Sequence, residues 1–272
     1  MGSPVIFAFA FSMLVALFWL KRFRKMDKYE KEPERLIYLV FGAGALAVVP
    51  SAILESFTNL SDHSEPLPLG NLFLIFLWVG IVEEFFKYLA VRLIAYRSSQ
   101  FNEVMDGMIY MISAALGFAA AENVGYMLGF GFFVGLLRAL LSYLGHVSFS
   151  AILGYYLGKA KIEGKRNWLW IGFIWAISLH WLYDAFFVVG TIHASLEFLL
   201  LGLMIWVFGL ILTYFLSRKA QAVSPFRRVH LLPKRLTRSC HACGKTVSAK
   251  AWICHHCGEP LKLEEEEITL KA

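Results

Sequence analysis

Long runs of uncharged, apolar residues dominate this chain. Several of them reach 17 to 20 residues, which as a helix rising about 1.5 Å per residue crosses roughly 30 Å of hydrocarbon. The chain is 58% hydrophobic and only 17% charged, whereas a soluble domain carries about 25% charged residues. Because a spanning backbone must satisfy its own hydrogen bonds, we predict an all-α polytopic membrane protein.

The apolar runs divide into about seven transmembrane helices. They cover residues 2–20, 36–54, 71–94, 107–128, 139–158, 168–189 and 196–217. The first run has positive charges after it and none before it, which argues against a cleaved signal peptide and for a retained helix. The apolar, Gly-rich stretch 129–138 is compatible with a re-entrant turn.

The charges of the connecting segments predict the orientation of the helices. Lys and Arg outnumber Asp and Glu by seven to four in 21–35, by four to one in 159–166 and by seven to none in 218–238. The segment 55–65 has three acids and no Lys or Arg. Basic loops stay in the cytoplasm, so we expect the N-terminus outside and the C-terminus cytoplasmic.

Charged and polar side chains interrupt the third to sixth spans, at a cost of roughly 2.5–3.5 kcal/mol for each charge at a helix centre. In chain order they are Glu83, Glu84, Lys87, Glu122, Arg138, His146, His180 and Asp184. Glu83 and Lys87 are four residues apart, so they share a helix face. His180 and Asp184 have the same spacing, which lets both side chains reach one metal ion or one water.

The depth of these residues is compatible with a single site. Counted from the outer ends of their spans, Glu122, His146, His180 and Glu83 lie roughly 9 to 18 Å below the outer surface at about 1.5 Å per residue. We therefore expect one polar cavity that opens toward the outside. Structural roles remain open for some members: Glu83 and Lys87 as an ion pair between helices, Arg138 as an interfacial residue at a span end, and Glu84 as a support for its neighbour.

Four motifs on four successive spans give the chain a family resemblance. Residues 83–87 (EEFFK) match EExxK, and residues 118–126 (FAAAENVGY) match FxxxExxxY. A looser element runs from Arg138 to His146, and residues 180–184 (HWLYD) match HxxxD. In this order the motifs resemble the PrsW family of intramembrane proteases, which is related to the prenyl-protein (CAAX) endopeptidase and bacteriocin-immunity superfamily. The resemblance covers about residues 36–190.

The resemblance implies a peptidase that cleaves a membrane-anchored protein near the extracytoplasmic side, as the best-known members do with single-span anti-sigma factors. It also implies a multi-pass protein of the cell membrane, the inner membrane of a bacterium or an archaeon. Hydrolysis needs an activated water, an acid for the leaving amine and positive charge for the oxyanion. In one mechanism a divalent metal such as Zn²⁺ is bound and Glu83 is the base. The ligands are then His146, His180 and either Asp184 or Glu122. In the other mechanism Glu83 activates water without a metal, and the histidines stabilise the oxyanion.

A second metal site is predicted in the tail. Cys240 and Cys243 form one CxxC pair, and Cys254 and Cys257 form another. Two such pairs at this spacing are typical of a structural zinc ribbon with tetrahedral coordination. Disulfides are the alternative, but a cytoplasmic location argues against them.

The chain accordingly divides into four segments. We predict a transmembrane protease-like domain (1–217), a basic juxtamembrane linker on the membrane surface (218–238), the zinc ribbon (239–260) and an acidic tail (261–272). The expected partners are the lipid bilayer, a membrane-anchored protein substrate and a cytoplasmic protein that binds the ribbon, with no nucleic acid.

Two other functions are compatible with these residues. Buried carboxylates and histidines also form proton or ion relays, so a coupled transporter or channel is one alternative. Neither the inverted repeats nor the paired broken helices of many transporters are evident in the sequence. The other alternative is a non-catalytic membrane scaffold that presents the ribbon to a cytoplasmic partner.

Overall fold

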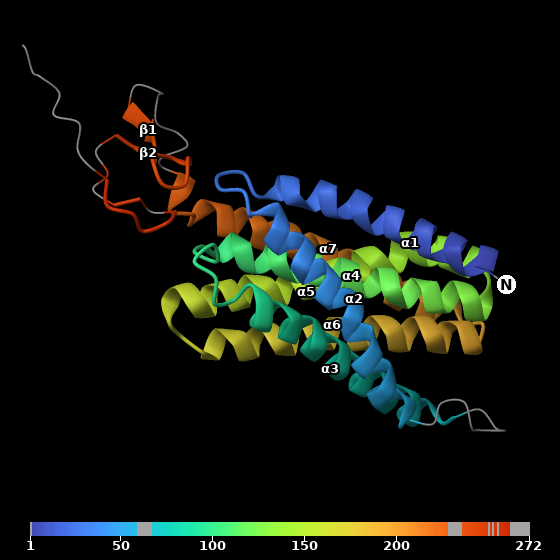
Figure 1. Cartoon of the computed structure of the whole chain (residues 1–272). Coiled ribbons are helices and arrows are strands. Elements are labelled where there is room, and N and C mark those ends of the chain that lie inside the picture. Colours follow the sequence, from blue (N-terminus) through green and yellow to red (C-terminus); the bar gives the residue numbers. More distant parts are fainter. Residues whose placement is uncertain are drawn as a thin grey trace, which may run out of the picture.

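Seven long helices form an elongated bundle, and a small zinc-ribbon-like module lies beyond one end of it (Figure 1). The computed structural model describes residues 2–58, 67–227, 236–249, 251, 253–254 and 256–261. The helices are α1 (Gly2–Phe23), α2 (Glu34–Ser56), α3 (Leu69–Ile94), α4 (Val104–Phe130), α5 (Phe132–Glu163), α6 (Asn167–Ile192) and α7 (Leu196–Ala222), with a 3-10 turn η1 (Arg24–Met26) after α1. All seven are long and apolar enough to cross a membrane, which confirms the predicted number of spans.

The connection between α4 and α5 differs most from the predicted boundaries. α4 continues to Phe130 and α5 begins at Phe132, so a single residue separates two helices. That residue is Gly131 at φ +91°, a conformation that glycine adopts at no steric cost. The stretch 129–138 is therefore not a re-entrant turn, because it contains the end of α4, the junction at Gly131 and the start of α5. Arg138 lies within α5 rather than at a span end. The boundary was obscure in the sequence because no charge marks it.

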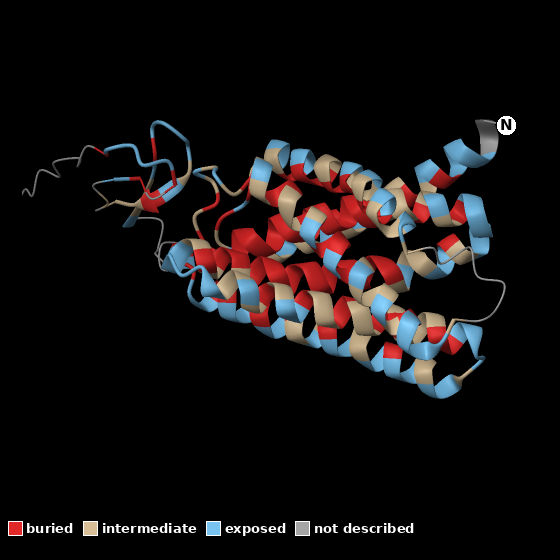
Figure 2. Ribbon diagram, turned by 90° about the horizontal axis from the view of Figure 1, so that it is seen from below, coloured by how far each residue is buried: buried red, intermediate tan, exposed pale blue. Residues whose placement is uncertain are grey.

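α4 is the central helix of the bundle. It packs most extensively against α5, α2 and α1. Figure 2 shows that the buried residues are concentrated in the interior of the helical bundle. The close packing depends on glycine: a Cβ atom on Gly107 would lie 2.2 Å from the carbonyl oxygen of Gly154 on α5. Small residues at such crossings let two backbones approach closely, which substitutes for the hydrophobic effect that lipid does not supply.

The ribbon consists of two antiparallel strands and two cysteine loops. Strand β1 (Thr237–Ser239) pairs with β2 (Thr246–Ser248). The Sγ atoms of Cys240 and Cys257 are 3.8 Å apart, and those of Cys243 and Cys254 are 3.7 Å apart. Four sulfurs at about 2.3 Å from one zinc ion are separated by about this distance. All four cysteines are free thiols, as expected for a metal site and unlike the disulfide alternative.

The ribbon contacts the end of the bundle near the segment between α1 and α2. The carboxylate of Glu30 accepts hydrogen bonds from Lys245 and from Nδ1 of His256, the latter at 2.6 Å. The ring of His256 also stacks on Phe226, with centroids 4.8 Å apart. α7 extends to Ala222, so the first part of the predicted 218–238 linker is helical. Residues 228–235 and 262–272, which include most of the predicted acidic tail, lie outside the described residues.

Candidate active site

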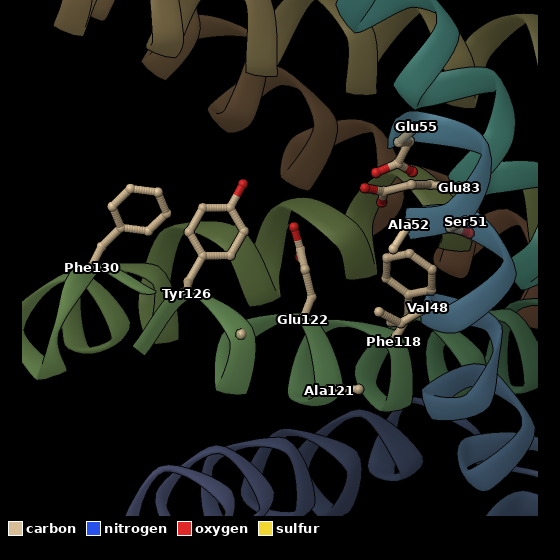
Figure 3. Close-up of a pocket in the computed structure, with 11 residues that line it drawn as sticks. Val48, Ser51, Ala52, Glu55, Glu83, Phe118, Ala121, Glu122, Tyr126 and Phe130 are labelled. Carbon is tan, nitrogen blue, oxygen red and sulfur yellow. The ribbon is translucent and has the colours of Figure 1, made fainter. Parts of the chain in front are cut away.

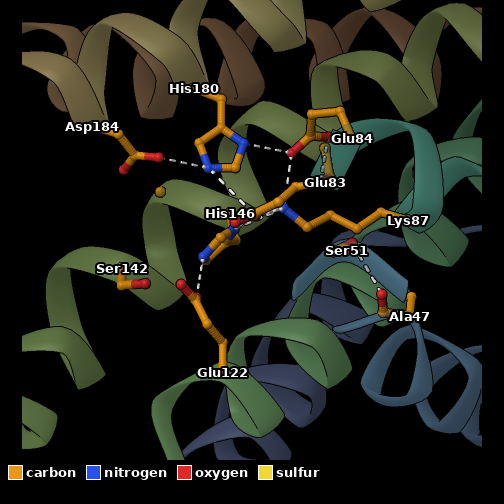
Figure 4. A network of polar contacts seen from close by, with 12 residues as sticks. Ala47, Ser51, Glu83, Glu84, Lys87, Glu122, Ser142, His146, His180 and Asp184 are labelled. Carbon is orange, nitrogen blue, oxygen red and sulfur yellow. Dashed lines mark hydrogen bonds and ion pairs between the residues drawn. The ribbon is translucent and has the colours of Figure 1, made fainter. Parts of the chain in front are cut away.

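The polar residues that interrupt the spans converge from four helices onto one cluster (Figure 4). α3 contributes Glu83, Glu84 and Lys87; α4 contributes Glu122; α5 contributes Arg138 and His146; and α6 contributes His180 and Asp184. Contacts of 3.6 Å or less link all eight side chains into one network. The sequence-predicted residues therefore lie together, as their similar depths suggested.

Lys87 is the electrostatic centre of this cluster. Its Nζ lies 2.9 Å from Glu83 and 3.0 Å from Glu84, and it donates a third hydrogen bond of 2.8 Å to Nδ1 of His146. The side chain of Lys87 is completely buried. A buried ammonium is tolerated when every one of its protons has a partner, and here the three donors of Lys87 are all used.

The two aromatic residues of the FxxxExxxY motif support two cations. Lys87 Nζ lies 4.4 Å from the ring centre of Phe118, and the guanidinium carbon of Arg138 lies 3.5 Å from that of Tyr126. Between the two rings, Glu122 forms an ion pair of 2.7 Å with Arg138. The four-residue spacing of the motif places all three side chains on one face of α4, so that Phe118, Glu122 and Tyr126 can all contact the polar cluster.

Each histidine directs one ring nitrogen to a carboxylate and the other toward Glu83. Nε2 of His146 lies 2.9 Å from Glu122, and Nδ1 of His180 lies 3.0 Å from Glu84. The remaining nitrogens, Nδ1 of His146 and Nε2 of His180, are each 3.6 Å from the same oxygen of Glu83. A carboxylate behind each imidazole is the usual arrangement around a metal-ligating histidine, because it fixes the tautomer and the ring orientation.

The donor atoms of this group fit a divalent metal ion. Glu83, His146 and His180 each offer one ligand atom, and these atoms lie within 4.8 Å of one another. Two ligands of a tetrahedral zinc ion are about 3.4 Å apart at the usual bond lengths, close to the two 3.6 Å separations. The fit requires that Lys87 release Nδ1 of His146, to which it donates a hydrogen bond. Sequence reasoning expected Glu122 or Asp184 as a ligand, whereas the compact group contains Glu83.

A cavity of about 800 Å³ leads to the cluster. Its lining includes Glu83, Glu122, His146 and Asp184 from the cluster, and Thr58 and Thr191 from the ends of α2 and α6. Those ends lie at the opposite end of the bundle from the ribbon (Figure 1). With the orientation predicted from the basic loops, the cavity opens on the extracytoplasmic side.

Sequence reasoning missed one residue of this cavity. Glu55 was expected in an acidic outer loop, but it belongs to the last turn of α2 and lines the cavity beside Glu83 and Glu122. In Figure 3 the carboxyl groups of Glu55 and Glu83 point toward each other. Its position four residues after Ser51, on one helix face, was the available signal. A charge at the end of an apolar run looked like the beginning of a loop.

Comparison with known proteins supports the same interpretation. The family model for "PrsW family intramembrane metalloprotease" matches residues 32–213. The chain belongs to this family. Among PrsW-family relatives, the Protease PrsW of Geobacillus kaustophilus is 35% identical over 173 residues, which are 63% of this chain and 73% of that protein. The Protease PrsW of Bacillus subtilis is 30% identical over 213 residues, 76% of this chain and 89% of that protein. No solved structure matches the chain.

The family match extends over all four motif-bearing helices of this PrsW-family chain. Residues 32–213 include α2 to α6 and most of α7, so the matched region contains the whole polar cluster and the cavity. The protein is therefore an enzyme, an intramembrane metalloprotease in a multi-pass cell-membrane bundle. The ribbon after residue 236 lies outside the matched region.

Proposed function

We propose that the enzyme cleaves a membrane-anchored protein, such as a single-span regulator of the anti-sigma-factor type, near the extracytoplasmic surface. The observation that carries this proposal is the cavity of about 800 Å³ that joins Glu83 and His146 to the end of the bundle opposite the ribbon. Its opening between the ends of α2 and α6 would admit an extended segment next to a transmembrane helix.

We assign Glu83, His146 and His180 as the group that would hold a catalytic metal, supported by their mutual separations and by the carboxylates behind both imidazoles. When bound, such an ion would polarise the scissile carbonyl and activate water for attack. In this assignment Glu83 is a ligand, whereas the sequence suggested that it is the base. Asp184, whose Oδ2 lies 3.2 Å from Nε2 of His180, borders the same position.

Arg138 is suited to stabilise the oxyanion that forms when the carbonyl is attacked. It lines the cavity, and Glu122 and Ser142 hold its guanidinium at 2.7 Å and 3.1 Å. Its Nε is buried and has no hydrogen-bond partner within the described residues. A fixed donor in a water-poor site contributes most when charge develops next to it.

The test is cleavage by a Glu83→Gln variant. Wild type and variant are co-expressed with a panel of tagged single-span membrane proteins, and cleavage products are detected by blotting. We expect the variant to be inserted at normal levels and to cleave none of them. The matched control is Glu34→Gln, which removes an exposed carboxylate at the other end of the bundle. Undiminished cleavage by Glu83→Gln would refute the proposed site.

The metal content of the same variant tests the role of Glu83. If Glu83→Gln loses both the membrane-domain metal and the cleavage activity, Glu83 is supported as a ligand, because a site with two remaining donors binds a metal weakly. Retention of the metal with loss of cleavage would instead make Glu83 the base. The double variant His146→Ala, His180→Ala provides the reference for a fully emptied site.

A further inference from the structure

We propose that Glu55 is the general base and acid of the reaction: it takes a proton from the attacking water and gives it to the leaving amine nitrogen. The inference rests on the proposed peptidase function. It concerns a residue outside all four motifs, at the end of α2 and at the mouth of the cavity.

The cavity has four carboxylates in its lining, and three of them are already engaged. They are Glu83, Glu122, Asp184 and Glu55. Glu83 is bound to Lys87, Glu122 lies between Arg138 and His146, and Asp184 lies beside His180. Glu84, which does not line the cavity, is completely buried and held by Lys87, Ser150 and His180.

Glu55 differs from the other carboxylates of the cavity because neither of its side-chain oxygens has a hydrogen bond or an ion pair within the described residues, whereas each of the others has a basic partner. Its Oε1 is buried and has no hydrogen-bond partner, and no ion pair involves its side chain in the part of the chain that the structure describes. Glu55 is half-buried, and a carboxylate oxygen that is buried without a hydrogen-bond donor or a cation is costly to keep. No contact within the described fold offsets that cost, which suggests that the group serves a substrate or a water rather than the packing of α2.

The position of Glu55 suits a proton carrier. Its carboxyl group faces that of Glu83 across the smaller cavity, of about 300 Å³, which both residues line together with Glu122 (Figure 3). A water placed between Glu55 and the Glu83 group would have the Glu55 carboxylate on one side and the proposed metal position on the other. Catalytic bases must lie within hydrogen-bond reach of the proton they remove, directly or through one water.

The proton balance of the step needs one carboxylate. The water oxygen bonds to the carbonyl carbon of the scissile peptide, and one water proton moves to Glu55. The tetrahedral species then collapses, the C–N bond breaks, and the nitrogen takes the proton from Glu55. Glu55 returns to its carboxylate form, and the products are one carboxylic acid and one amine.

The experiment uses the full-length enzyme purified in detergent and a fluorescently tagged single-span reporter that the wild type cleaves. Glu55→Gln is compared with wild type for kcat, for the pH profile of kcat/KM and for metal content. We expect kcat to fall by roughly 10²–10⁴-fold, the range for loss of a general acid–base group. The acidic limb of the pH profile should disappear, and the membrane-domain metal should be retained. Glu34→Gln, the same substitution at the start of α2, should match wild type in all three.

Two results would overturn the proposal. One is a Glu55→Gln enzyme with kcat within about threefold of wild type and an unchanged acidic limb, while Glu83→Gln is inactive. The other is a Glu55→Gln enzyme that has lost both its membrane-domain metal and its activity, which would make Glu55 a metal ligand. If Glu55→Gln does not fold, Glu55→Asp is measured instead: a proton carrier should keep partial activity with a displaced acidic limb, whereas an unmoved limb counts against the proposal. Cleavage by Glu83→Gln would instead overturn the peptidase site itself.

Discussion

Nε2 of His146 lies 2.9 Å from Oε2 of Glu122, and this contact leaves Nδ1 of the same ring facing Glu83. The carboxylate thus sets which nitrogen is available at the centre of the cluster. Glu122 is in turn fixed by Arg138. A chain of three side chains from two helices therefore determines the orientation of one potential ligand.

The first prediction concerns this contact. Glu122→Gln keeps the shape of the side chain but removes the charge behind the imidazole, so the metal affinity of the membrane site should fall about 10–100-fold. Metal titration of the purified, metal-stripped protein measures the affinity. Glu163→Gln, on the same helix as His146 and partly exposed near the ribbon end, is the control. An unchanged affinity in Glu122→Gln would show that the orientation of His146 does not depend on this carboxylate.

A second prediction concerns Lys87. Lys87→Met leaves Glu83 and Glu84 buried without their common cation, and breaking a buried ion pair in this way costs about 3–5 kcal/mol. Unfolding in mixed detergent micelles gives the free energy difference. Lys159→Met breaks a more exposed i,i+4 pair with Glu163 and should cost no more than about 1 kcal/mol. Equal effects of the two substitutions would contradict a central electrostatic role for Lys87.

Helical periodicity was enough to predict most of the candidate site. The four-residue spacings of Glu83 with Lys87 and of His180 with Asp184 place each pair on one face, and span depth predicted that these faces meet. The sequence could not show which helices are neighbours. It also could not assign ring nitrogens, because the contact of His146 with Glu122 depends on the packing of α5 against α4.

The differences between expectation and structure occur at helix ends. Glu55 was placed in a loop because hydropathy counts a charge as the end of a span, although the helical backbone continues through Glu55 to Ser56. The α4–α5 junction was missed for the opposite reason, since Gly131 separates two apolar helices without any polar residue. In both cases the backbone hydrogen bonds decide where the helix ends, and hydropathy is only an indirect measure of them.

The third prediction is a pH dependence at the ribbon end of the bundle. Burial raises the pKa of Glu32, just before α2, from its ordinary value of 4.5 to about 7, so the folded protein keeps a proton that the unfolded chain loses near pH 4.5. The contribution of Glu32 to the free energy of unfolding should therefore be greatest below about pH 4.5 and should decline as the pH rises to about 7. The contribution is on the order of 3 kcal/mol.

Thermal unfolding in detergent between pH 5 and pH 8 measures this effect. Glu32→Gln should flatten the decline of Tm with rising pH and should raise Tm at pH 8 relative to wild type. Glu34→Gln, two residues further and exposed, should keep the wild-type slope. A slope that is the same in Glu32→Gln and wild type would assign the pH dependence to other groups.

The last prediction is that the two proposed metal sites can be emptied separately. The four cysteine sulfurs, with separations of 3.7 and 3.8 Å in two pairs, match a closed tetrahedral zinc site. The Glu83, His146 and His180 group shares no residue with it and lies on helices α3, α5 and α6 of the bundle. Wild-type protein should contain about two metal ions per chain. Cys254→Ser and the double variant His146→Ala, His180→Ala should each reduce this to about one. Elemental analysis of purified protein counts the ions.

The reporter assay then separates the roles of the two metal sites. Cleavage should persist in Cys254→Ser, because the ribbon contacts the bundle at the end opposite the cavity. Cleavage should cease in the histidine variant. Loss of cleavage in Cys254→Ser with the membrane-site metal still bound would instead show that the ribbon controls the active site through its contact with Glu30.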